Sequence, residues 1–524
     1  MQAGRVILYD TTLRDGTQGQ GISFSLLDKL RIAEKLAQFG MGIIEAGWPG
    51  SNIKDLDVFR EVRRRSWGRT KIAAFGSTRR ANLEISKDPQ IQMLRDAETP
   101  VVTFFGKSWK LHVTEVLGTT PEENRAMITD TVSYFKQLNR EVIYDAEHFF
   151  DGYKDDPDHA LGTLDAARDA DVLVLCDTNG GTLPHEVEEI VYKVNELFPN
   201  KIGIHTHNDC ELGVANALAA VRAGAVQVQG TINGYGERTG NCNLTSLIAN
   251  LQLKLGIPVV EKLAELREVS LFVDELANCP PNIRAPFVGA TAFTHKGGMH
   301  VNAVQKLARS YEHIEPCSVG NEQNILVSEL SGQSNVLLKT ERMGIHLQRG
   351  SREVIEILKQ LKDYEARGYE FEAADASFEL LVRGILGQRR ALFDLKEYHC
   401  SFRRMSVGNN CACEATVKLS VDGIFEYTVD EGDGPVDALD KALRKALRPF
   451  YPWIDCIRLA DYKVRILDGL RGSAAGTRVL IVSTNGHRTW GTVGVSDNII
   501  EASWLALVDS FEFYGLHGMS GSST

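Results

Sequence analysis

The sequence predicts an α/β protein: a (β/α)8 TIM barrel followed by a helical extension and a duplicated α+β C-terminal domain. Within residues 1–250, eight short apolar runs alternate with amphipathic helical stretches, which is typical of a (β/α)8 barrel. A doubly wound open sheet is the alternative with the same alternation. It would be expected to carry a glycine fingerprint after its first strand, and the sequence has none there.

The barrel strands are predicted from the eight apolar runs. They occupy residues 5–10, 41–47, 71–76, 100–106, 141–147, 171–177, 201–207 and 226–233. Stretches between them, such as 26–40, 184–199 and 210–224, have the apolar spacing of amphipathic helices. The first and third of these stretches end in glycine, which is favoured just after a helix.

The remainder of the chain is predicted to form two further parts. Beyond the barrel, which we place at residues 1–275, the pattern becomes helical and irregular, and we assign 276–378 to helical linker subdomains. Residues 379–524 contain strand-like runs that predict two β-meanders, each followed by a helix. The segments "VDALDKAL" and "IEASWLAL" share a pattern, which indicates an internally duplicated domain.

Bulk composition narrows the class of protein and its surroundings. The chain has 524 residues, 43% of them hydrophobic and 24% charged, as expected for a soluble globular protein with several domains. A net charge of −11 argues against nucleic-acid or anionic-membrane partners. Nine scattered cysteines without a CxxC pair indicate a reducing compartment, and no apolar run reaches about 18 residues. We therefore expect a cytoplasmic protein.

The hexapeptide "IHTHND" places two histidines inside a predicted strand. Side chains at i and i+2 of a strand point the same way, so His205 and His207 project from one face, about 6–7 Å apart at their Cα atoms. This spacing allows both rings to reach one metal ion. A pair of satisfied core histidines is the alternative that this segment alone leaves open.

Polar groups follow five of the predicted strands, at the rim where a TIM barrel carries its working residues. The candidates, in chain order, are Arg14, Asp15, Gln18, Glu147, Thr178, His205, His207 and Asn241. Asp15, His205 and His207, with the Asn241 carbonyl as a fourth ligand, form a mixed set that suits Mg²⁺, Mn²⁺ or Zn²⁺. A turn role for Asp15 and a helix N-cap role for Asn241 compete individually, but convergence of all four groups favours the metal.

Three motifs carry a resemblance to a known family. "DTTLRDGTQ", "HTHND" and "NGYGERTGN" are similar to motifs of the metal-dependent synthases of 2-isopropylmalate, homocitrate and citramalate, which condense acyl-CoA with 2-oxo acids. The resemblance extends over nearly the whole chain. Within the group, "GWPGSN" and "AEHFFDGYK" resemble the citramalate synthase branch most.

The resemblance implies a Claisen-type condensation of acetyl-CoA with pyruvate, followed by thioester hydrolysis. The family positions match Arg14 for the developing alkoxide, Thr178 for the substrate carboxylate and Glu147 for proton abstraction. His300 and Tyr311 match the pair that the extension contributes to the site, often across a dimer. Position 145 differs from a pattern in which tyrosine flanks the glutamate: this chain has Asp145 there.

The resemblance also implies regulation and leaves alternatives. In the family the duplicated domain forms a homodimer and binds the end product, which predicts isoleucine as the effector of this chain. 2-Isopropylmalate synthase, with 2-oxoisovalerate as acceptor and a leucine effector, is the nearest alternative. A thioester-cleaving lyase of the same barrel superfamily and a non-catalytic amino-acid sensor are the others.

Overall fold

The computed structural model describes residues 6–51, 53–326, 332–404, 411–467 and 475–518. Contacts divide the chain into two compact units. Unit 1 comprises residues 1–293 and 313–323, and unit 2 comprises 294–312 and 324–524. The predicted extension, 276–378, therefore contributes residues to both units, and the three-domain division remains a prediction.

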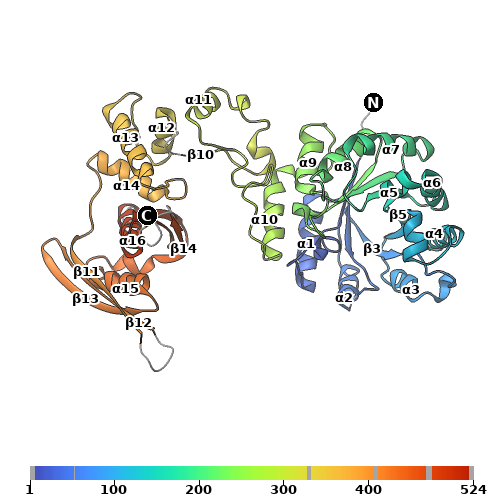
Figure 1. The fold of residues 1–524 in the computed structure, drawn as a ribbon, viewed down its shortest axis with the longest axis horizontal. Coiled ribbons are helices and arrows are strands. Elements are labelled where there is room, and N and C mark those ends of the chain that lie inside the picture. The colour runs from blue at the N-terminus through green and yellow to red at the C-terminus, as the bar shows by residue number, and fades with distance from the viewer. Residues whose placement is uncertain (1–5, 52, 327–331, 405–410, 468–474, 519–524) are drawn as a thin grey trace. The chain divides into compact units, whose positions relative to one another are not determined.

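Unit 1 is a closed barrel of eight parallel strands, which confirms the predicted fold (Figure 1). The strands are β1 (Ile7–Asp10), β2 (Ile43–Gly47), β3 (Lys71–Ser77), β4 (Val101–Lys107), β5 (Glu141–Glu147), β6 (Val172–Asp177), β7 (Ile202–Thr206) and β8 (Gln227–Gly230). Strands β1 and β8 pair in parallel and close the ring.

Helices surround the barrel. They are α1 (Leu26–Phe39), α2 (Ile53–Val62), α3 (Pro89–Asp96), α4 (Pro121–Gln137), α5 (Phe149–Asp155), α6 (Pro157–Ala166), α7 (Pro184–Leu197), α8 (Gly213–Arg222), α9 (Leu244–Leu253) and α10 (Leu266–Leu276). Helix α1 begins with a capping box between Ser25 and Asp28, and the predicted Gly40 follows its end with φ 103°. Gly224 takes the same left-handed region, with φ 110°, just beyond the end of α8.

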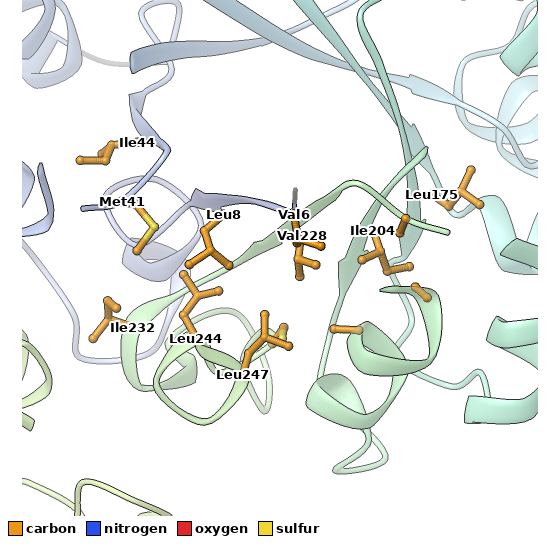
Figure 2. Close-up of a cluster of buried hydrophobic side chains, with 14 of the residues drawn as sticks. Val6, Leu8, Met41, Ile44, Leu175, Ile204, Val228, Ile232, Leu244 and Leu247 are labelled. Carbon is orange, nitrogen blue, oxygen red and sulfur yellow. The ribbon is translucent and has the colours of Figure 1, made fainter. Parts of the chain in front are cut away.

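The main core of unit 1 lies between the strands and the helices. Figure 2 shows Leu8 and Val228 of the strands beside Leu244 and Leu247 of α9, all fully or almost fully buried. The opposite faces of the strands fill the barrel interior with a second cluster that includes Tyr9 and Ile143. Because the interior is packed, working groups can gather only at its mouth.

Unit 2 contains short strands β9 (Thr294–His295) and β10 (Asn324–Ile325), four helices, and then the duplicated part. The helices are α11 (Gly298–Lys306), α12 (Gln333–Arg342), α13 (Arg352–Ala366) and α14 (Asp375–Ile385). The first copy consists of β11 (Asp394–Arg404), β12 (Cys411–Val421), β13 (Ile424–Gly432) and α15 (Pro435–Leu447). The second consists of β14 (Arg458–Ile466), β15 (Thr477–Thr484), β16 (Thr489–Ser496) and α16 (Ile499–Gly518). Each copy is an antiparallel three-stranded sheet followed by a helix, as the sequence predicts.

Candidate active site

A cavity of about 230 Å³ opens at the carboxyl ends of the barrel strands. Its lining includes seven of the predicted residues: Arg14, Asp15, Gln18, Glu147, Thr178, His205 and His207. The structure thus brings together groups that follow β1, β5, β6 and β7 at one rim. In the sequence the most distant of them are almost 200 residues apart, so chain proximity does not explain the cluster.

Asp15, His205 and His207 form the predicted metal-binding cluster. Each offers one ligand atom, and these atoms lie within 4.8 Å of one another. Asp15 Oδ2 is 3.3 Å from His205 Nε2. Burial raises the pKa of Asp15, but Arg14 and the two histidines outweigh it and hold that pKa below its usual value. Burial, helped by His205, lowers the pKa of His207 to about 3, so this ring is neutral and has a free lone pair.

Two buried polar atoms beside this cluster lack partners among the residues that the structure describes. They are Nδ1 of His207 and Oδ1 of Asn241. The backbone of Asn241 forms an isolated β-bridge with His207, and its side-chain nitrogen Nδ2 donates to the Tyr235 carbonyl at 3.2 Å. Buried polar atoms normally have partners, so a cation ligand is a reasonable function for both of these. The donor set therefore fits a divalent metal ion.

Arg14 is held rigidly at the mouth. Its Nε donates to Glu45 Oε1 at 2.5 Å, and its guanidinium carbon lies 3.7 Å from the centre of the Phe75 ring. Tyr9 donates to the second oxygen of Glu45 at 2.7 Å. Burial raises the pKa of Glu45, although Arg14 opposes this. Glu45 was not among the predicted site residues, although an acid inside the apolar run "MGIIEAG" was a usable signal.

Glu147 ends β5 and lies opposite Lys107, the last residue of β4, in the strand register. The two side chains form an ion pair and are partly exposed, and Glu147 lines the cavity. Lys107 was also absent from the predicted set. Its place one strand from Glu147 could not be deduced without the barrel register.

Thr178 is fixed through its backbone and its hydroxyl. Its Oγ1 accepts the His148 N–H at 2.9 Å, and its carbonyl accepts from Arg238 at 2.7 Å. Arg238 in turn makes two hydrogen bonds to Asp209, at 2.7 and 2.9 Å. The hydroxyl proton of Thr178 has no acceptor in the part of the chain that the structure describes, so it is available to a ligand in the cavity.

Three aromatic rings form one wall of the cavity. Trp48, Phe75 and Phe105 lie after or within the ends of β2, β3 and β4. Phe75 and Phe105 stack with centroids 5.8 Å apart, and Trp48 meets both rings edge-on at 5.7 and 5.9 Å. The wall was not predicted, although each ring stands at a strand end in the sequence.

His300 and Tyr311 belong to unit 2. Their rings stack with centroids 4.3 Å apart, and Tyr311 is exposed. His295, another histidine of this segment, lies 3.2 Å from Glu312. The structure therefore pairs His300 with Tyr311 and gives His295 a different partner.

Comparison with known proteins identifies three matching regions. The HMGL-like family matches residues 5–273, the homocitrate synthase post-HMGL domain-like family matches 287–368, and the LeuA allosteric (dimerisation) domain matches 372–514. The (R)-citramalate synthase of Aquifex aeolicus is 54% identical over 98% of this chain and 98% of its own. The chain belongs to the citramalate synthase family.

Further relatives agree with this placement. The (R)-citramalate synthase of Geobacter sulfurreducens is 51% identical over 98% of both chains. The 2-isopropylmalate synthase of Pyrococcus furiosus is 32% identical over 97% of this chain and 99% of its own. The predicted family is therefore confirmed, as is its enzyme class, a transferase that condenses an acyl group. The isopropylmalate synthases are more distant.

Proposed function

We propose that this chain condenses acetyl-CoA with pyruvate and water to give (R)-citramalate and CoA, a step towards isoleucine. The observation that carries the proposal is the geometry of the mouth. There a three-ligand cluster, Arg14 and Glu147 line one small cavity in a chain with near-complete similarity to citramalate synthases. The aromatic wall favours a small acceptor such as pyruvate over the branched 2-oxoisovalerate.

We assign Asp15, His205, His207 and the amide oxygen of Asn241 as ligands of a divalent cation, Mn²⁺, Mg²⁺ or Zn²⁺. When bound, the ion would supply Lewis-acid polarisation of the 2-oxo acid. Glu45 occupies Nε of Arg14, and Asp15 Oδ1 lies 3.2 Å from its Nη1. We assign the guanidinium donors that remain to the alkoxide that develops as the carbonyl is attacked. Gln18 and Thr178 bind the substrate carboxylate.

Glu147 is the base that takes a proton from the methyl carbon of acetyl-CoA. Its partner Lys107 keeps the carboxylate in place at the end of β5. The resulting enolate carbon bonds to the ketone carbon of pyruvate, and the ketone oxygen accepts a proton. Water then adds to the thioester and CoA leaves as the thiol. We assign His300 and Tyr311 to proton transfer in these steps.

A CoA-release assay with acetyl-CoA and a panel of 2-oxo acids tests the assignment. We expect pyruvate to give the highest kcat/KM. A clear preference for 2-oxoisovalerate would instead make the chain a 2-isopropylmalate synthase. Chelation should abolish turnover and added Mn²⁺ or Mg²⁺ should restore it, whereas full activity of metal-free protein would contradict the ligand set.

Assembly and location complete the proposal. We propose a homodimer through the duplicated domain with isoleucine as inhibitor, supported by the match to an allosteric dimerisation domain. On the outer face of β13, Phe425 and Tyr427 are 65% and 63% exposed, which suits an interface with a second copy.

We place the enzyme in the cytoplasm, because the cysteines that the structure describes are free thiols. None of the described helices has the length and apolarity needed to cross a membrane.

A further inference from the structure

A hydrogen-bonded chain of side chains connects His205 on β7 to residues of β8 and β5. His205 Nδ1 is 2.9 Å from Gln229 Oε1, and Gln229 Nε2 donates to Asp145 Oδ1 at 3.0 Å. His205 and Gln229 are register partners on β7 and β8, whereas Asp145 lies on β5, three strands from β8. Gln229 is 0% exposed, and Asp145, which also lines the cavity, is 4% exposed, so both bonds are largely shielded from bulk water.

The chemistry of these groups determines which nitrogen of His205 carries the hydrogen. Gln229 donates through Nε2 to the oxygen of Asp145, which orients its Oε1 towards His205. In this orientation of the amide its Oε1 can only accept, so we assign the hydrogen to Nδ1 of His205. In the neutral ring the lone pair is then on Nε2, the atom that faces Asp15 at 3.3 Å.

We propose that Gln229 is a positioning residue for His205, and that Asp145 acts through Gln229 by fixing its orientation. The proposal rests on the proposed metal site. Partners that bind the second nitrogen of a ligand histidine fix its tautomer and typically contribute 10–100-fold to metal affinity. Asp145, which departs from the pattern of some relatives, thereby acquires a function that does not require contact with substrate.

Mn²⁺ titration of the full-length, metal-free protein tests the proposal without any turnover. Gln229→Leu removes both hydrogen bonds, and we expect Mn²⁺ to bind about 10–100-fold more weakly than to wild type. Gln227→Leu is the matched control. Gln227 lies two residues earlier on β8, is equally buried, and its side-chain amide has no hydrogen-bond partner among the described residues. We expect this control to keep wild-type affinity.

A rescue variant separates hydrogen bonding from packing. In Gln229→Glu/Asp145→Asn, the new carboxylate accepts both from His205 Nδ1–H and from the amide at position 145. We expect this pair to bind Mn²⁺ about tenfold more tightly than Gln229→Leu, because the acceptor for His205 is restored. If Gln229→Leu does not fold, Gln229→Met replaces it as the unbranched deletion.

Each result has a distinct meaning. Wild-type Mn²⁺ affinity in Gln229→Leu would overturn the role of Gln229 while leaving the metal site intact. An equal loss in Gln227→Leu, or no recovery in the double variant, would also overturn it. A wild-type protein that binds none of Mn²⁺, Mg²⁺ and Zn²⁺ would refute the metal site itself, and with it this inference.

Discussion

At the scale of single residues, substitution of the base and substitution of a metal ligand should have different effects on kcat and on metal affinity. Glu147 lies outside the three-residue cluster and pairs with Lys107, so Glu147→Gln should leave Mn²⁺ affinity close to wild type. The same change should lower kcat about 10²–10⁴-fold, because proton abstraction loses its base. Steady-state kinetics and metal titration measure both effects.

His207→Ala is the complementary variant, since it removes a ligand and leaves the base in place. We expect it to lose metal and, with it, turnover. Wild-type turnover in both variants would show that the reaction takes place elsewhere on the molecule.

Asp10 provides a prediction of pH-dependent stability. Burial raises its pKa from 3.8 to about 7, although Thr12 donates two hydrogen bonds to it. Between pH 3.8 and about 7, Asp10 loses its proton in the unfolded chain but keeps it in the folded chain. The free energy of unfolding therefore falls as the pH rises towards 7, and then stays level. The loss from pH 5 to 8 is on the order of 3 kcal/mol.

Asp10→Asn, which cannot ionise, should therefore escape this loss. Calorimetry at pH 5 and pH 8 should show the variant gaining in thermal midpoint over wild type mainly at pH 8. Asp28→Asn serves as control. Hydrogen bonds from Ser25 lower the pKa of Asp28, so this carboxyl is ionised at both pH values. The difference in thermal midpoint between Asp28→Asn and wild type should therefore be the same at pH 5 and pH 8. The same difference in thermal midpoint between Asp10→Asn and wild type at pH 5 and pH 8 would contradict the prediction.

At the scale of elements, we expect the aromatic wall at the ends of β2, β3 and β4 to limit the size of the acceptor that the cavity admits. Phe105 lies on the cavity side of β4, and its neighbour Phe104 faces the core between strands and helices. Phe105→Leu should create room for a branched acceptor. We expect the kcat/KM ratio of 2-oxoisovalerate to pyruvate to rise about 10–200-fold.

The alternation of the strand supplies the control for this prediction. Phe104→Leu removes a ring of the same size from the other face of β4, so it should lower the thermal midpoint without changing the ratio. If the two variants shifted the acceptor preference equally, the aromatic wall would not be the selective element.

Strands and their polar ends were predictable because both depend on local sequence. The apolar runs and the glycines at 40 and 224 mark element ends, and the eightfold alternation then places Asp15, Glu147 and His205 at one rim. Glu45 binds Arg14, which lies 31 residues away in the sequence. Gln229 binds His205, 24 residues away, and Asp145, 84 residues away. Such contacts follow from the closure and register of the barrel, which no short segment encodes.

At the scale of the whole molecule, the duplicated domain shares a buried cluster with the helices that precede it, so a chain that ends near residue 375 would lose part of that cluster. Val336 and Leu361, which precede residue 375, share one buried cluster with Phe378 and Val493, which follow it. Removing the duplicated domain near residue 375 would therefore expose apolar surface on α12 and α13. Point substitutions on an exposed face are the cleaner way to test its function.

The outer face of β13 is the place for such substitutions. Phe425 and Tyr427 alternate with Glu426 and Thr428, which point to the other side of the sheet, where Thr428 bonds the carbonyl of Ala442 in α15. Two exposed aromatic rings in a row form an apolar strip that a second copy could bury. We expect Phe425→Lys/Tyr427→Lys to convert a dimer into a monomer, measured as mass by light scattering.

The same variant tests whether assembly and regulation are one property. An effector inhibits by favouring one conformational state, and the free energy that couples its site to the active site is usually about 1–3 kcal/mol. In a dimeric regulatory domain, that conformational state depends on the interface between the two copies. We therefore expect isoleucine to inhibit the wild type and to lose that inhibition in the variant. Tyr192→Lys, which replaces an exposed aromatic ring on α7 of the barrel unit, should change neither mass nor inhibition. Wild-type protein that is monomeric would contradict the dimer, and wild-type activity unaffected by millimolar isoleucine would contradict the effector.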